Sequence, residues 1–255
     1  MSSSTSTACS SRTWEADRLP MRVAAAWLVH LFTASGVVLA FLALEAIDRG
    51  EWRLALLCLL AALAVDGIDG TLARWARVKE HAPSIDGEAF DLIVDYLNYV
   101  FVPAVFIVRA GLVPPGLALP LAAAILLSSV YVFVRRDMKT EDNYFRGFPA
   151  LWNVVALYLF AARPGPTAGA VAVIVLAVLS FAPIVLVHPF RVREWQPWLK
   201  LFALLWAAAT LALLWPGWSA GAARAWLAAS LALAAVLIAL GLVRTVRGPA
   251  RPPAG

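Results

Sequence analysis

The sequence predicts an all-α integral membrane protein with about eight transmembrane helices and both termini in the cytoplasm. Three observations predict this class: the composition, the recurrence of long apolar runs and the distribution of basic residues. Of the 255 residues, 62% are hydrophobic and 15% are charged. A soluble domain of this length does not need so many apolar side chains, whereas a helix of about 20 apolar residues crosses a bilayer.

Short polar or Pro/Gly-rich breaks separate the apolar runs and place the ends of each predicted span. The eight spans cover residues 25–47, 52–74, 86–108, 116–134, 148–162, 167–187, 198–215 and 223–243. The fifth is short for a membrane crossing, so we expect it to be tilted or partly interfacial.

The basic residues set the orientation. With a cytoplasmic N-terminus, 16 of the 21 lysines and arginines fall on the cytoplasmic side of the eight spans. Cytoplasmic loops of membrane proteins carry such an excess. A basic face beside anionic membrane lipids also accounts for the net charge of +5, so we predict no nucleic-acid partner.

The same pattern divides the chain into three parts. Residues 1–22 are rich in Ser and Thr and are predicted to be a disordered cytoplasmic tail. Residues 23–244 form the transmembrane domain. Residues 245–255 are rich in Pro and Gly and are predicted to be a cytoplasmic C-terminal tail.

Four aspartates lie inside the predicted spans at regular spacing. Asp66 and Asp69 are three residues apart near the cytoplasmic end of the second span, and Asp91 and Asp95 are four apart near the start of the third. Residues so spaced share a helix face, and the short connecting loop makes the two helices antiparallel neighbours. Each intramembrane carboxylate costs roughly 2.5–3.5 kcal/mol on insertion scales, so the four need a compensating charge. Oxygen ligands without a nearby cysteine favour Mg²⁺ or Mn²⁺ over zinc.

Small residues accompany the aspartates. Gly70 and Gly87 each lie one helical turn from an aspartate on the same face, and Ala73 is similarly small. These positions leave room for a bulky ligand, although close helix packing would also account for them. Arg74 follows at the helix end, with a guanidinium shaped to bind phosphate. A metal, an arginine and a cleared pocket together indicate phosphoryl-type chemistry.

These residues carry a resemblance to a known family. The runs Asp66-x-x-Asp69-Gly70-x-x-Ala73-Arg74 and Gly87-x-x-x-Asp91-x-x-x-Asp95 are similar to the signature of CDP-alcohol phosphatidyltransferases. Twelve residues separate the two runs, where the family usually has eight. This longer gap, together with segments 28–36, 139–149 and 187–191, resembles the bacterial phosphatidylcholine synthase branch.

The resemblance implies a reaction in which CDP-diacylglycerol and choline give phosphatidylcholine and CMP. It implies an active site that faces the cytoplasm at the bacterial inner membrane, with two divalent ions, Mn²⁺ or Mg²⁺. The implied metal ligands are Asp66, Asp69, Asp91 and Asp95, of which Asp95 is also the implied general base. The implied CDP- or CMP-binding residues are Asp66, Gly70, Ala73, Arg74 and Gly87. Relatives are often homodimers, so a homodimer is also expected.

Two further groups of residues are candidates for substrate contacts. Choline is a quaternary ammonium, which binds to aromatic faces. The choline candidates are Tyr96, Tyr99, Glu141, Tyr144 and Trp152. A basic group is either a binding surface for the lipid diphosphate or ordinary positive-inside charge. That group contains Arg135, Arg136, Lys139 and Arg146.

Two other functions remain open. A phosphatidylserine or phosphatidylglycerophosphate synthase would share the aspartates, but the twelve-residue gap argues against it. A divalent-cation transporter would use the aspartates as a midplane site. Against this, they cluster at one cytoplasmic level, and Arg74 beside them would repel a permeating cation. Metal-dependent release of CMP would separate an enzyme from a transporter.

Overall fold

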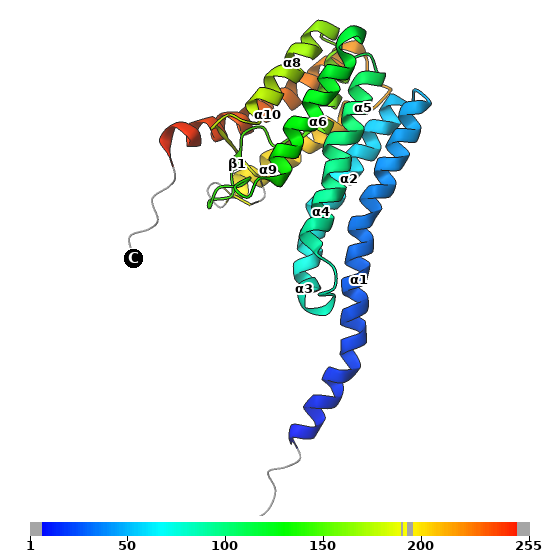
Figure 1. The fold of residues 1–255 in the computed structure, drawn as a ribbon, viewed down its shortest axis with the longest axis vertical. Coiled ribbons are helices and arrows are strands. Elements are labelled where there is room, and N and C mark those ends of the chain that lie inside the picture. Colours follow the sequence, from blue (N-terminus) through cyan, green and yellow to red (C-terminus); the bar gives the residue numbers. More distant parts are fainter. Residues whose placement is uncertain (1–6, 190, 193–195, 249–255) are drawn as a thin grey trace, which may run out of the picture.

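The computed structural model describes residues 7–189, 191–192 and 196–248, and most of these are helical (Figure 1). The first half contains α1 (Thr7–Asp48), α2 (Trp52–Trp75), α3 (Val78–His81), α4 (Gly87–Tyr96), the π-helical segment η1 (Leu97–Phe101), α5 (Val102–Arg109), the 3₁₀ turn η2 (Pro115–Leu117) and α6 (Ala118–Val134). The second half contains β1 (Phe145–Arg146), α7 (Trp152–Ala162), α8 (Pro166–Leu179), β2 (Val185–Leu186), α9 (Gln196–Ala212) and α10 (Ala220–Arg247).

Five stretches in the described part of the chain are long and apolar enough to cross a membrane. They are Pro20–Asp48, Trp52–Trp75, Gly87–Arg109, Pro115–Val134 and Ala220–Arg247. These stretches coincide with the first four predicted spans and the eighth. The fifth and sixth predicted spans correspond to apolar helices of 11 and 14 residues, α7 and α8. The seventh corresponds to α9, which has 17 residues.

Several helix ends differ from the predicted boundaries. Helix α1 begins at Thr7, within the predicted N-terminal tail of residues 1–22, of which residues 1–6 lie outside the described part. Extending a formed helix adds one hydrogen bond per residue without a new nucleus. At the other end, α10 continues to Arg247, into the predicted C-terminal tail, of which residues 249–255 lie outside the described part.

The fifth and sixth predicted spans are shorter than the sequence suggested. Pro149 disfavours a helical conformation at residue 148, Ala150 has a left-handed φ of +56° and Leu151 has a non-helical ψ of 60°, so the fifth begins only at Trp152. The sixth ends at Leu179, because the chain then leaves the helix and forms β2.

The first three long helices pack together. Helix α1 contacts α2, α4 and α5, and Figure 1 shows it running along one side of the molecule past the end where α3 lies. At Gly36 of α1, an added Cβ would lie 2.6 Å from Val94 Cγ1 of α4, so only glycine permits this approach. The Gly36 carbonyl also accepts a 2.9 Å hydrogen bond from Asn98 Nδ2. This contact fixes α1 against the helix that carries Asp91 and Asp95.

Hydrogen bonds inside the apolar region join α10 to the other helices. The Ser230 hydroxyl lies 2.7 Å from the Tyr158 hydroxyl of α7 and 2.8 Å from Thr210 Oγ1 of α9. Trp206 Nε1 of α9 donates to the same tyrosine oxygen at 2.7 Å. Because unsatisfied polar groups are costly away from water, this network fixes the position of α10.

A small antiparallel sheet joins two loops that are distant in sequence. Strand β1 pairs with β2, with Phe145 opposite Leu186 and Arg146 opposite Val185. Gly147 follows with a φ of +75°, and an added Cβ there would lie 2.5 Å from the Ser180 carbonyl oxygen. We call residues 135–149 the first and residues 180–189 and 191–192 the second of the paired loops.

Candidate active site

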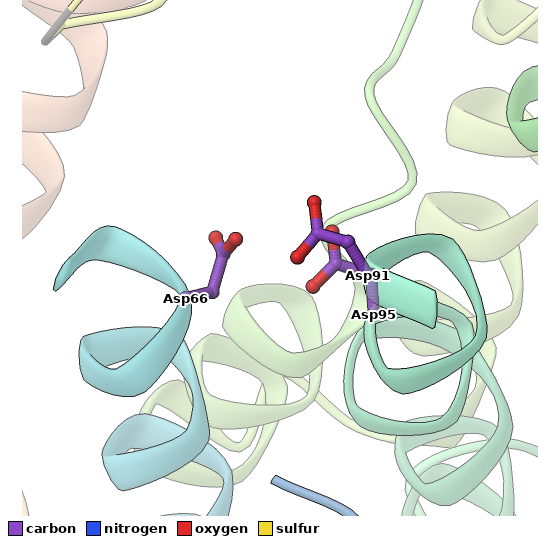
Figure 2. Close-up of side chains that lie close together, drawn as sticks. All are labelled: Asp66, Asp91 and Asp95. Atoms are coloured by element: carbon purple, nitrogen blue, oxygen red, sulfur yellow. The ribbon is translucent and has the colours of Figure 1, made fainter. Parts of the chain in front are cut away.

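Three carboxylates meet across the gap between α2 and α4. Asp66 extends from α2, and Asp91 and Asp95 extend from adjacent turns of α4 (Figure 2). Each offers a carboxylate oxygen, and these oxygens all lie within 4.8 Å of one another. We call these residues the aspartate trio. The four-residue spacing on α4 places two of the carboxylates on one face.

The start of α4 is fixed by a local cap. The side chain of Asp86 accepts hydrogen bonds from the backbone N–H groups of Glu88 and Ala89, both at 3.1 Å. These are two of the four N–H groups that a helix start leaves without intrahelical partners. The cap therefore sets where α4 begins, and with it the position of Asp91 one turn later.

The fourth aspartate has a different environment. Asp69 is buried and accepts a 2.9 Å hydrogen bond from Thr33 Oγ1 of α1. It lies outside the aspartate trio, although it is on the same helix as Asp66. Thr33 lies in segment 28–36, which carries part of the family resemblance, but its contact with Asp69 was not predicted, because a contact between distant helices has no periodic signal in the sequence.

A tyrosine holds Asp66. The Tyr99 hydroxyl, from the π-helical segment one turn beyond Asp95, donates a 2.6 Å hydrogen bond to Asp66 Oδ2. Tyr99 is buried, at 6% exposure. It was predicted as a choline contact, and the structure places its hydroxyl on a carboxylate of the trio. π-Helical turns are rare and are often found at functional sites.

The donor set of the trio fits a hard divalent cation. Its three carboxylates supply only oxygen, which Mg²⁺ and Mn²⁺ prefer. Asp66, Asp91 and Asp95 would hold such an ion. Hydroxyl donors on Asp66 and Asp69 fix carboxylate orientation in the way that supporting residues do around metal sites.

Curated proteins similar to this chain share one name. This chain is 48% identical over 178 residues to a phosphatidylcholine synthase of Pseudomonas aeruginosa, and the match covers 70% of this chain and 75% of that protein. It is 43% identical over 185 residues to that of Mesorhizobium japonicum, covering 72% and 69%. It is 40% identical over 169 residues to that of Borreliella burgdorferi, covering 66% and 72%.

The chain belongs to the phosphatidylcholine synthase family. It is therefore an enzyme, a transferase of phospholipid biosynthesis. No family model matches the chain.

In this member of the phosphatidylcholine synthase family, the other predicted nucleotide-binding residues lie on the same two helices as the trio, toward the end of α2 and at the start of α4. An added Cβ at Gly70 would meet Arg74 Nη1 at 3.5 Å, and at Gly87 it would meet His30 Cε1 at 3.8 Å. Both distances are ordinary van der Waals contacts, so a methyl group would fit at either glycine without a shift of its neighbours. Ala73 is half-buried. Arg74 is exposed, and its guanidinium donates a 3.1 Å hydrogen bond to Thr71 Oγ1.

The other choline candidates have separate positions. Tyr96 donates a 3.1 Å hydrogen bond to the Leu126 carbonyl, and Glu141 is exposed. Tyr144 is buried, with the Arg244 guanidinium 5.5 Å from its ring centroid. Trp152 is fully buried in the core, where its indole N–H donates to a serine hydroxyl. The structure therefore does not place Trp152 at a surface that a ligand could reach.

Two of the predicted basic residues contact the same aspartate. Arg135 makes two hydrogen bonds to Asp137, at 2.8 and 2.9 Å, and Arg146 lies 3.8 Å from the same carboxylate. Hydrogen bonds from Arg135 lower the pKa of Asp137 below its ordinary value. Arg136 is exposed. These contacts favour the interpretation of this group as ordinary cytoplasmic loop charge.

Two other cations approach the trio. The charges of all three trio carboxylates act on the ammonium of Lys139, which is half-buried. The charge of Arg191 acts on Asp69 and Asp91. Lys139 belongs to the basic group that the sequence offered for the lipid diphosphate, whereas Arg191 was not a predicted site residue. They come from loops far apart in the sequence, and no short motif indicates that these loops meet.

Proposed function

We propose that this protein is a phosphatidylcholine synthase that transfers the phosphatidyl group of CDP-diacylglycerol to choline and releases CMP. The observation that carries the proposal is the aspartate trio, whose oxygens converge within 4.8 Å at the end of two neighbouring helices. The names of the relatives supply the acceptor. The signature around the trio supports membership of the wider CDP-alcohol phosphatidyltransferase family.

The proposal includes two divalent ions, Mn²⁺ or Mg²⁺, with Asp66, Asp69, Asp91 and Asp95 as ligands. When bound, they would neutralise negative charge on the diphosphate and on the departing CMP. Thr33 and Tyr99 hold two of these carboxylates in place through the hydrogen bonds described above. Carboxylates fixed before the substrate arrives need less reorganisation during the reaction.

Asp95 is the proposed general base. Its carboxylate takes the proton of the choline hydroxyl, the choline oxygen forms a bond to the phosphorus of the phosphatidyl group, and the bond from that phosphorus to the CMP oxygen breaks. A base must reach the proton that it takes. Asp95 projects into the same gap as the two other trio carboxylates, so an acceptor entering that gap meets it (Figure 2).

The residues around the gap have proposed binding roles. Arg74 binds phosphate of the CMP half, and Gly70, Ala73 and Gly87 leave space for the nucleotide. The choline ammonium would bind near aromatic rings, for which Tyr96, Tyr99 and Tyr144, with Glu141 as the anion, remain the candidates.

The proposed arrangement in the bilayer has eight crossings, with residues 23–244 as one transmembrane domain. Both termini and the site face the cytoplasm of a bacterial inner membrane. The excess of basic residues on one side supports this orientation. Helices α7 and α8 are shorter than a straight crossing needs, so they would cross where the bilayer is locally thin. A homodimer is also proposed.

The experiment that tests the proposal measures CMP release by the full chain purified in detergent. CDP-diacylglycerol and Mn²⁺ or Mg²⁺ are supplied with choline, serine or glycerol 3-phosphate in separate reactions. We expect release with choline alone, and its loss on chelation. Release with serine or glycerol 3-phosphate would support a phosphatidylserine or phosphatidylglycerophosphate synthase instead. No release with any alcohol would contradict the proposal and favour the cation transporter.

A further inference from the structure

The paired loops bring two cations to the aspartate trio. Lys139 lies on the first loop and Arg191 on the second, and each charge acts on carboxylates of the site. Burial and the nearby charge of Arg191 lower the pKa of Lys139 from its ordinary value. The charges of the trio carboxylates act on the Lys139 ammonium in the opposite direction.

An aromatic pair supports these cations. The His188 ring stacks on the Phe145 ring, with centroids 5.1 Å apart and planes 9° apart. Lys139 Nζ lies 5.1 Å from the Phe145 centroid. Burial, and then the charges of Lys139 and Arg191, lower the pKa of His188 to about 3, so its imidazole is neutral near pH 7. The two cations and the neutral ring therefore form one cluster across both loops.

The cluster has a charge pattern that suits an anion. Among the described residues, neither Lys139 nor Arg191 has a carboxylate oxygen within 4.0 Å. Two like charges held near each other repel, and a bound anion relieves that repulsion. Choline carries a positive charge and would be repelled by the same cations. The diphosphate of a CDP-linked lipid is the anion that the proposed reaction brings to this place.

The last helix anchors the first of these loops. Arg244, in the last turn of α10, pairs with Asp142 at 2.7 Å, and its guanidinium lies 5.5 Å from the Tyr144 centroid. Thr140 Oγ1 donates to the other oxygen of Asp142 at 2.6 Å and accepts a 2.9 Å hydrogen bond from the Tyr144 N–H. Arg244 thus contacts the loop immediately after Lys139.

The same turns of α10 anchor the second loop. Thr245 Oγ1 accepts a 2.9 Å hydrogen bond from the backbone N–H of Val185 in β2. At Gly241, an added Cβ would lie 2.5 Å from the Val185 carbonyl oxygen, so the helix and the strand touch backbone to backbone. Because β1 pairs with β2, both loops are fixed to one end of α10.

We propose that Lys139 and Arg191 bind the diphosphate of the CDP-linked substrate, and that Arg244 is a positioning residue that holds the paired loops so that these cations face the aspartate trio. This inference rests on the proposed function. It gives α10 a role in the reaction although α10 contributes no residue to the trio.

Lys139→Met tests the binding role, with Lys200→Met, an exposed lysine of α9, as the matched control. KM is measured for CDP-diacylglycerol at saturating choline and for choline at saturating CDP-diacylglycerol. A hydrogen bond to a charged group contributes roughly 1.5–3 kcal/mol, so we expect Lys139→Met to raise the KM for CDP-diacylglycerol about tenfold or more. The KM for choline and the behaviour of Lys200→Met should stay unchanged.

Three results would overturn the binding role. The first is an unchanged KM for CDP-diacylglycerol, and the second is a rise in the KM for choline alone. The third is a lower metal concentration for half-maximal activity with both KM values unchanged, because Lys139 would then act only as a counter-ion to the carboxylates. In each case an active wild-type protein leaves the proposed function standing. A wild-type protein that releases no CMP with choline would contradict the proposed function itself.

Arg244→Ala tests the positioning role, with the exposed Arg247→Ala as control. We expect Arg244→Ala to raise the KM for CDP-diacylglycerol several-fold, and Arg247→Ala to leave it unchanged. Arg244→Asp combined with Asp142→Arg restores an ion pair with reversed charges, and it should recover KM relative to either single change. If the double variant folds, as judged by its thermal unfolding, but recovers nothing, the positioning role is wrong.

Discussion

The Tyr99 hydroxyl donates a 2.6 Å hydrogen bond to Asp66 Oδ2, which joins the π-helical segment after α4 to α2. Short hydrogen bonds of this kind are typical of an ionised acceptor. The bond occupies one oxygen of Asp66 and sets the direction of its carboxylate. The two helices that carry the aspartate trio are therefore connected directly, side chain to side chain, at the candidate site.

Tyr99→Phe removes this bond and leaves the ring in place. Residues that orient metal ligands typically contribute 10–100-fold to metal affinity or activity, so we expect a loss of about tenfold in kcat. The metal concentration for half-maximal activity should rise as well. Tyr131→Phe is the control, because Tyr131 is 40% exposed. A metal requirement unchanged in Tyr99→Phe would show that the bond does not orient Asp66.

Asp95→Asn keeps the shape of the side chain and removes its ability to accept a proton. General-base catalysis typically contributes about 10²–10⁴-fold, so we expect CMP release to fall to background. Binding of CDP-diacylglycerol, followed by equilibrium dialysis with a labelled lipid headgroup, should persist. Robust turnover in this variant would refute the base assignment.

Removal of divalent metal should abolish activity reversibly. The trio presents carboxylates whose charges repel one another unless a cation is bound. We expect a chelator to stop CMP release and added Mn²⁺ or Mg²⁺ to restore it. Asp91→Asn should need at least about tenfold more metal for half-maximal activity, whereas Asp48→Asn, at the far end of α1, should need no more than the wild type. Activity that persists in excess chelator would contradict a metal-dependent reaction.

Gly36→Ala should destabilise the protein. The new methyl group would lie 2.6 Å from Val94 Cγ1, so α1 and α4 must separate. Overpacking of this kind typically costs about 1–3 kcal/mol. The measurement is the Tm in detergent. Gly116→Ala is the control, because no heavy atom lies within 4 Å of the new methyl group, and its Tm should match the wild type. Equal Tm values for the two variants would show that the close approach of α1 and α4 does not contribute to the stability of the protein.

Helical periodicity was sufficient to place Asp66 opposite Asp91 and Asp95. Spacings of three and four residues define a helix face, and a short connection makes two helices antiparallel neighbours. The five long apolar helices could also be predicted from the sequence, because an uninterrupted apolar run of membrane length is typical of a transmembrane helix. These features depend only on residues close in the sequence or on composition.

Contacts between segments distant in the sequence could not be predicted. Thr33 is 36 residues from Asp69, and its hydrogen bond depends on how α1 packs against α2. Strands β1 and β2 have two residues each, too few for an alternating pattern to appear. Without that pairing, Arg191 could not be associated with Lys139, although the sequence already offered Lys139 as a contact for the lipid diphosphate. Arg135 belongs to the basic group that the sequence offered as a binding surface. In the structure it pairs instead with a neighbouring aspartate.

The π-helical segment Leu97–Phe101 keeps the two halves of one long helix out of phase. Such a turn holds one residue more than an α-helical turn. Losing a single residue here would restore a regular α-helix and rotate one half against the other by about 100°. With α5 held in the core by the fully buried Phe106 and Ile107, the half that turns is the one bearing Asp91 and Asp95. A one-codon deletion at this point would therefore separate the carboxylates while every one of them stays in the chain.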